Sequence, residues 1–226
     1  MAATIILVEG NPGSGKSTSW ENMPENESCI ISPNSKPLPF EGFSKRYKEK
    51  KKNIFYNTQL NQVGDYLLNI SEKAPNVKYI NIEDITHFWN QRTTDPKFIA
   101  KKSGGEAFSK WNELAGEILV NIFLTAQKLR DGMFVVINAH VENKDDGKVS
   151  LLTPGKILDA NIKIPSYFTY IFHSVVIPEN GKPTYKFLTN DDGVHEAKTP
   201  KNCFKELYID NDMKAIIDRI KEYQGN

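Results

Sequence analysis

GNPGSGKS, residues 10–17, carries the strongest structural signal in this 226-residue chain. It satisfies the P-loop spacing G-x-x-x-x-G-K-S and directly follows the apolar run IILV at residues 5–8. The apolar run predicts a buried strand over residues 4–8, and residues 17–23 predict a helix that Pro24 ends. In this context the glycines let backbone N–H groups form a nest for a polyphosphate at the positive end of a helix dipole.

The loop therefore predicts a site for Mg-ATP. Lys16 would reach the β- and γ-phosphates, and the hydroxyl of Ser17 would hold Mg²⁺. The alternative is a flexible glycine turn, which the agreement of pattern and context disfavours. The residues predicted to contact the nucleotide are Gly10, Asn11, Pro12, Gly13, Ser14, Gly15, Lys16, Ser17 and Thr18.

Two acids follow the apolar run KYINI and are candidates for Walker B. Glu83 and Asp84 would lie at the carboxyl end of a strand, where ligands gather in open α/β sheets. The sequence leaves open which acid joins the magnesium shell and which activates the attacking water; we favour Glu83 for the first role and Asp84 for the second. The alternative for Asp84 is a helix N-cap, and both roles can hold at once.

His140 comes just after another apolar run, MFVVIN at residues 133–138. A polar side chain there would lie beside the γ-phosphate and could sense its presence. The alternative is a structural histidine at the end of a strand.

The rest of the chain alternates strand and helix signals, which predicts an α/β fold with a mostly parallel central sheet in a single domain, residues 1–226. Helices are expected from residue 59, over 106–130 and over 212–223, and a β-hairpin over 167–177 and 185–189. The 106–130 helix would bury one broad face, made of Phe108, Trp111, Leu114, Ala115, Ile118, Leu119, Ile122, Phe123 and Ala126.

Bulk composition is that of an ordinary soluble protein, with 39% hydrophobic and 25% charged residues. The net charge of +1 means that any attraction to nucleic acid must come from a local patch. Cys29 and Cys203 are too far apart for a zinc motif and fit a reducing cytoplasm. We find no export signal and no run near the roughly 18 apolar residues of a membrane span.

One local patch is the basic run KRYKEKKK at residues 45–52. It could contact a phosphate backbone, with Phe40, Phe43 and Tyr47 as stacking surfaces. The alternative is a solvated loop that binds nothing.

Several segments together resemble phage-encoded ATP-binding proteins with a single RecA-like core, relatives of the RecA/RadA-type recombinases that anneal single strands. They are VEGNPGSGKS, INIEDI, VVINAH, TPGKILDANIKIPSYFTYIF, YKFLTNDDG, AKTP and YIDNDMKAIIDRIKEY, which cover most of the chain. The resemblance implies a three-layer RecA-like P-loop fold with a C-terminal β-hairpin extension. It also implies Mg-ATP at subunit interfaces, homo-oligomeric rings or filaments, and action on single-stranded DNA in phage recombination or replication.

Within that resemblance, Glu83 stands where the family often has aspartate, and Asn81 interrupts the apolar strand, so hydrolysis is expected to be slow or altered. Lys156 of TPGK and Lys198 of AKTP fall where RecA-like proteins offer basic residues to a neighbour's ATP, which makes them candidate trans-acting fingers. For both, the alternative is an ordinary surface lysine.

Two other functions stay open. A short α/β chain with an amino-terminal P-loop also suits a nucleotide or polynucleotide kinase, although arginines are sparse. The altered Walker B sequence also fits an ATP-dependent assembly module with little turnover.

Overall fold

The computed structural model describes residues 3–100 and 104–225. Among these, eight strands form one sheet in the order β10-β9-β8-β1-β5-β4-β2-β3. The strands are β1 Thr4–Gly10, β2 Ser28–Ile31, β3 Ile54–Phe55, β4 Tyr79–Ile82, β5 Phe134–Ala139, β8 Tyr170–Glu179, β9 Lys182–Leu188 and β10 Tyr208–Asp210. A separate small ribbon pairs β6 Val141–Asn143 with β7 Val149–Leu151.

The sheet is parallel from β3 to β8 and antiparallel only at the β8–β9 and β9–β10 pairs. The short, almost continuously apolar runs noted in the sequence form the parallel strands, because such strands are buried on both faces. β5 lies between β1 and β4, so the P-loop and the two acids end on the same edge with one strand between them. The predicted mostly parallel α/β sheet is confirmed.

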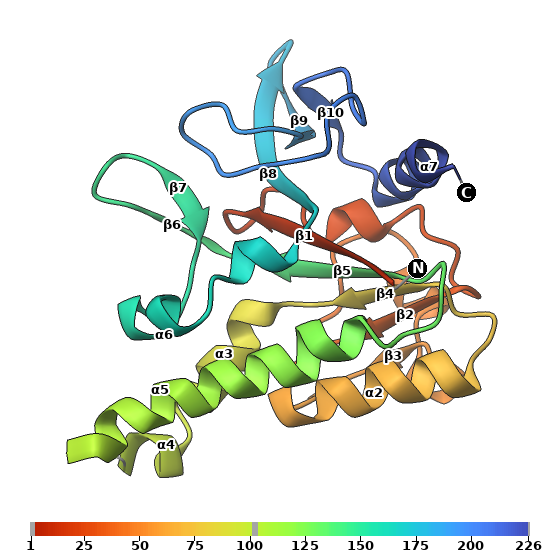
Figure 1. The fold of residues 1–226 in the computed structure, drawn as a ribbon. Helices are drawn as coiled ribbons and strands as arrows, with labels where there is room; N and C mark the ends of the chain where they lie inside the picture. Colours follow the sequence, from red (N-terminus) through yellow and green to blue (C-terminus); the bar gives the residue numbers. More distant parts are fainter. Residues whose placement is uncertain (1–2, 101–103, 226) are drawn as a thin grey trace.

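Helices cover both faces of the sheet (Figure 1). On one face lie α2 Leu60–Lys73, α3 Ile85–Thr93 and α5 Gly104–Ile118, which continues into a π-helical segment, Leu119–Leu124. On the other face lie α7 Met213–Gln224 and the short 3₁₀ turn Thr18–Trp20. The remaining elements are α1 Phe43–Arg46, the 3₁₀ turns Glu49–Lys51 and Ile164–Tyr167, α4 Pro96–Ala100 and α6 Lys156–Asn161.

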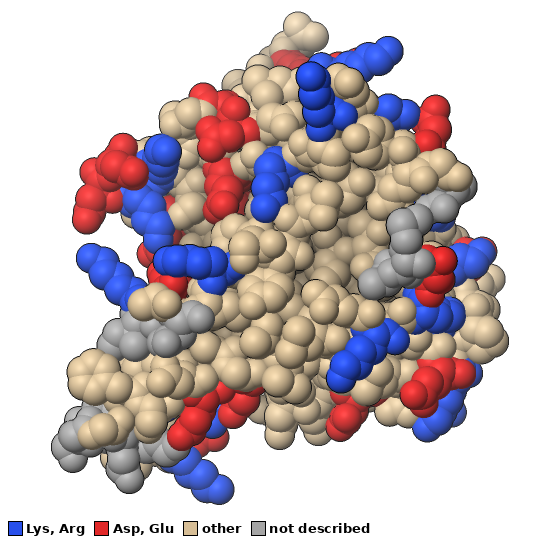
Figure 2. Space-filling view, viewed as in Figure 1, with Lys and Arg blue, Asp and Glu red and all other residues tan. Residues whose placement is uncertain are grey.

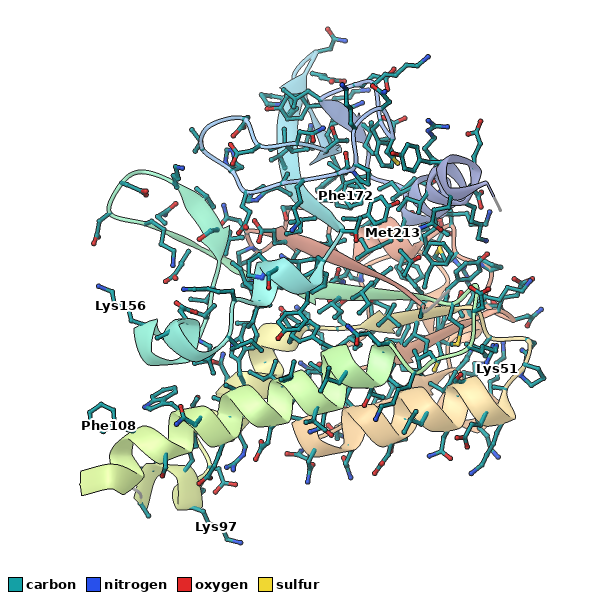
Figure 3. The ribbon with its side chains drawn as sticks, in the orientation of Figure 1. Lys51, Lys97, Phe108, Lys156, Phe172 and Met213 are labelled. Atoms are coloured by element: carbon teal, nitrogen blue, oxygen red, sulfur yellow. The ribbon has the colours of Figure 1, made fainter. Side chains whose placement is uncertain are left out.

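Alternation along β1 builds the two halves of the core. Ile5 and Leu7 pack with α2, α3 and α5, whereas Ile6 and Val8 pack with Trp20 and α7. Successive strand residues point to opposite faces, so one short run can serve both layers. Phe172 of β8 and Met213 of α7 belong to the second half, at the place where Figure 3 labels them. In the described part of the chain no helix has the length and apolar character needed to cross a bilayer.

The predicted hairpin is confirmed as β8 and β9. Asn180 and Gly181 connect the two strands with φ angles of 52° and 75°. Positive φ at both central residues is the geometry that matches the twist of paired strands, and Asn-Gly adopts it readily. The hairpin adds the antiparallel edge to the sheet.

The prediction of a helix over residues 17–23 is wrong. Only Thr18–Trp20 forms a 3₁₀ turn, although Ser19 N still donates to Gly15 O. Ser17, Thr18 and Ser19 are poor helix formers, and Pro24 limits any extension. The side chain of Trp20 is also buried in the core beneath α7. A single short turn supplies little dipole, so the loop's own N–H groups and Lys16 must carry any attraction to phosphate.

The long helix predicted over residues 106–130 exists as α5 and its π-helical continuation, but Phe108 does not join its buried face. Its side chain is 64% exposed. The amino-terminal part of α5 extends past the sheet beside α4, and Phe108 points away from the body there (Figure 3). No sheet lies opposite this turn in the described part of the chain, so the side chain of Phe108 stays largely exposed.

Candidate functional site

The P-loop is shaped by its packing against β8 and β9. Gly10 and Gly15 have φ angles of +154° and +102°. A Cβ on Gly10 would lie 2.7 Å from Ser174 O, and one on Gly15 would lie 2.9 Å from the ring of Tyr185. Ser174 Oγ also donates to Ser14 O over 2.6 Å. Both positions therefore require glycine, for backbone conformation and for space.

Lys16 folds back over the loop. Its Nζ donates to Gly10 O at 2.8 Å and to Asn11 O at 2.9 Å, and the side chain is buried. Burial lowers the pKa of Lys16, while the charges of Asp84 and Glu83 act in the opposite direction. The ammonium group is thus held inside the loop, where an anionic phosphate would find a positive charge.

Glu83 receives three hydrogen bonds. The Ser17 hydroxyl donates to Oε1, while the amide groups of Asn138 and Asn81 both donate to Oε2, the latter over 3.2 Å. Asn81, read from the sequence as an interruption of the strand, is fully buried and orients this carboxylate. Burial raises the pKa of Glu83, and the three donors partly offset that effect.

Asn138 was missed by the sequence reasoning. Its strand neighbour Ile137 pairs with Ile82, so Asn138 and Glu83 leave adjacent parallel strands side by side. The available signal was an asparagine at the end of an otherwise apolar run.

Ser17 and Glu83 together fit Mg²⁺. Their touching hydroxyl and carboxylate oxygens form a hard, all-oxygen donor set, which is the set that Mg²⁺ prefers. Ser17 comes from the P-loop and Glu83 from the end of β4, so the fold brings the two predicted ligands together.

Asp84 uses its two oxygens differently. Oδ1 accepts the backbone N–H of Thr86 at 2.9 Å and so caps α3. Oδ2 lies 2.9 Å from His140 Nε2. The backbone N–H of His140 donates to the hydroxyl of Thr86, which fixes the position of His140. Asp84 therefore acts as the N-cap that was considered as its alternative role, and its second oxygen contacts His140.

A cavity of about 490 Å³ opens between these groups. Beyond the predicted residues, it is lined by the proline-rich segment that follows β2, by His87 and by Tyr185. Loops after parallel strands converge at one edge, which was the available signal for this segment. The lining comprises Pro12, Gly13, Gly15, Lys16, Ser17, Thr18, Asn34, Lys36, Pro37, Leu38, Pro39, Glu83, Asp84, His87, His140 and Tyr185.

Lys156 and Lys198 do not line this cavity. Lys156 begins α6, is exposed, and points away from the body in Figure 3. Lys198 Nζ donates to Pro165 O over 3.0 Å. Neither lysine is brought to the P-loop of its own chain.

The basic run at residues 45–52 does not carry the expected stacking surface. Phe43 and Tyr47 are buried in the core, and their rings stack with centroids 5.5 Å apart. Arg46 holds the carbonyls of Glu21 and Met23. Phe43, Tyr47 and Arg46 are therefore structural, because the segment packs under the turn that follows the P-loop, while Phe40 is half-buried beside them.

A buried acid–imidazole pair lies next to the P-loop and was not anticipated. Glu9 directly precedes Gly10, and its Oε1 lies 3.1 Å from His173 Nδ1. Burial, together with the nearby Glu196, raises the pKa of Glu9 to about 9. Burial and the ring of His195 lower the pKa of His173 to about 4. At neutral pH the contact is therefore a neutral hydrogen bond, and it adds no negative charge beside the phosphate nest.

These shifts predict that Glu9→Gln stabilises the fold at alkaline pH. The unfolded carboxyl loses its proton near pH 4.5 and the folded one near pH 9, so the free energy of unfolding falls as pH rises between them. We expect the variant to gain roughly 2–4 kcal/mol at pH 8 and nothing near pH 4.5. Denaturant unfolding across this pH range measures the difference. An equal gain at both pH values would contradict it.

Comparison with known proteins supports the fold. No protein-family model matches the chain, and no curated protein matches its sequence. Among solved structures, a KaiC-like protein from the hyperthermophilic archaeon Pyrococcus horikoshii OT3 matches with a TM-score of 0.50 and 13% identity, covering 92% of this chain and 84% of that one. The fold is thus the RecA-like, KaiC-type P-loop fold. At this identity the likeness establishes the fold alone, and function must be argued from the site.

Proposed function

We propose that this chain is a Mg²⁺-dependent ATPase of the RecA type. One observation carries the proposal: Lys16, the Ser17–Glu83 contact and the Asp84–His140 pair all border the same cavity. A glycine nest, a lysine, a hydroxyl and carboxylates at one sheet edge are the groups that phosphoryl transfer to water requires.

Each group has a distinct task in this proposal. The loop from Gly10 to Thr18 binds the triphosphate, and Lys16 exchanges its two carbonyl partners for phosphate oxygens. Ser17 and Glu83 would hold Mg²⁺, which when bound would supply positive charge next to the phosphates. Asp84 Oδ2, the oxygen not used to cap α3, orients and deprotonates the attacking water. His140 holds that oxygen in place and responds to the γ-phosphate.

We further propose that the ATPase works as a homo-oligomer on single-stranded DNA in phage recombination or replication, which the sequence resemblance supports. Lys156 and Lys198 would act on the neighbouring subunit's nucleotide, since neither lines its own cavity. On the face shown in Figure 2, Lys and Arg side chains are interspersed with Asp and Glu. This face would therefore not serve as a uniformly basic DNA-binding surface, and assembly could align basic side chains from several subunits.

A second function has a specific observation in its favour. The cavity is lined by Asn34, Lys36 and Pro39 as well as by the P-loop, so an acceptor could bind between these residues and the nucleotide. A kinase that phosphorylates a nucleoside or a polynucleotide end would use this space, with Lys36 facing the acceptor's charge.

One experiment separates these functions. ATP hydrolysis is measured with and without single-stranded DNA, oligomer size is followed in parallel, and labelled γ-phosphate is traced to water, nucleosides or DNA ends. We expect DNA to raise hydrolysis and assembly size together. Label transferred to an acceptor would establish the kinase instead, and ATP-dependent assembly without phosphate release would leave only a nucleotide-dependent assembly module.

A further inference from the structure

Three potential metal ligands gather at the rim of the cavity, apart from the Ser17–Glu83 contact. One ligand atom from each of Asp84, His87 and His140 lies within 4.8 Å of the others. Asp84 is the N-cap of α3 and His87 is the third residue of the same helix, positions whose side chains lie next to each other. His140 arrives from the end of β5, so two elements build the cluster.

The Asp84–His140 separation is close to that of two ligands on a single ion. Asp84 Oδ2 and His140 Nε2 are 2.9 Å apart. Two ligands on a shared ion with metal–ligand bonds near 2.1 Å stand about 3.0–3.4 Å apart. The His87 and His140 rings lie at 78° to each other with centroids 6.1 Å apart. His87 is exposed, so its ring can move the remaining distance without disturbing the core.

We propose that Asp84, His87 and His140 bind a divalent transition-metal ion, represented by Zn²⁺. Two imidazoles and one carboxylate are the donor set of open zinc and non-haem iron sites, with further positions left for water. Mg²⁺ prefers oxygen ligands alone. The two neighbouring cation sites would therefore select different ions, with Mg²⁺ at Ser17 and Glu83 and a transition metal at the histidines.

Binding at this second site has a consequence that rests on the proposed function. The ion takes Asp84 Oδ2, the oxygen assigned to the attacking water. It leaves Lys16, Ser17 and Glu83 untouched. Zn²⁺ should accordingly slow ATP hydrolysis while nucleotide binding persists.

The test measures binding directly, without relying on activity. Zn²⁺ is titrated into the full chain in excess Mg²⁺ against a zinc-chelating dye, and Co²⁺ is added separately to observe its visible absorption. We expect one ion per chain. His87→Asn should weaken Zn²⁺ binding by at least about tenfold and change the Co²⁺ spectrum, because an exposed ligand is lost without harm to the fold.

His195→Asn is the matched control. This histidine pairs with Asp192 rather than with the cluster, so its loss should leave Zn²⁺ affinity unchanged. Asp84→Asn provides a second ligand variant and should also weaken binding. Equal affinity in wild type and His87→Asn, or loss of binding in His195→Asn, would overturn the site. Zinc binding without ATPase activity would retain the site and refute the proposed function instead.

Discussion

Lys16→Ala raises the dissociation constant for Mg-ATP by about 10²-fold or more and abolishes measurable hydrolysis. Lys16 is the cation held inside the loop, where its Nζ already bonds two loop carbonyls. Each charge-assisted hydrogen bond to phosphate contributes about 1.5–3 kcal/mol, and the variant loses every such bond that the Lys16 ammonium would make. Calorimetric titration with a slowly hydrolysed ATP analogue measures the change.

The fold should survive this substitution. Lys16 is buried at a desolvation cost that lowers its pKa, so its removal relieves a penalty. Lys97→Ala, an exposed lysine on α4, serves as the control and should bind nucleotide like wild type. Full nucleotide affinity in Lys16→Ala with a native melting profile would refute the P-loop assignment.

Glu83→Gln should separate catalysis from stability. The carboxylate is the proposed Mg²⁺ ligand, and an amide cannot replace its charge, so we expect turnover with Mg²⁺ to fall about 10²–10³-fold. Nucleotide binding measured in EDTA should change little, since Lys16 and the loop remain. Steady-state hydrolysis and equilibrium binding, compared in the same buffer, give the two values.

The same variant should be at least as stable as wild type at pH 8. Burial raises the pKa of Glu83 in the folded state. The unfolded carboxyl therefore loses its proton at lower pH than the folded one, and the free energy of unfolding falls as pH rises. A residue kept at a cost to stability is expected at a functional site. Glu72→Gln, on the exposed side of α2, is the control. Near-wild-type turnover in Glu83→Gln would remove Glu83 from the proposed mechanism.

Much of the fold could be predicted because its signals are local. The run before Gly10 had the length and composition of a buried parallel strand, and the Asn180–Gly181 turn supplied the φ angles a hairpin needs. The helix predicted over residues 17–23 did not form for a local and a tertiary reason: the residues before Pro24 are poor helix formers, and Trp20 is buried in the core beneath α7. The predicted burial of Phe108 was wrong because helical periodicity does not show where the opposing sheet ends.

Most of the predicted site residues border one cavity in the structure, but the contacts between them could not be predicted from the sequence. Glu83 was expected to bind metal, yet only strand register places Asn138 beside it. His140 was expected near the γ-phosphate, and the structure pairs it with Asp84. The roles assigned to these residues remain predictions.

Local chemistry along the chain specified the glycine loop, the order of strands and helices, and which residue types stand at strand ends. These features depend on neighbours a few positions apart, and residue spacing encodes them directly. The 490 Å³ cavity, the buried Glu9–His173 pair and the cluster of Asp84, His87 and His140 arise only on folding. Thr86 and His140 beside the cluster are 54 positions apart, and Glu9 and His173 are 164 positions apart. Their distances depend on sheet register and packing, which no single stretch of sequence contains.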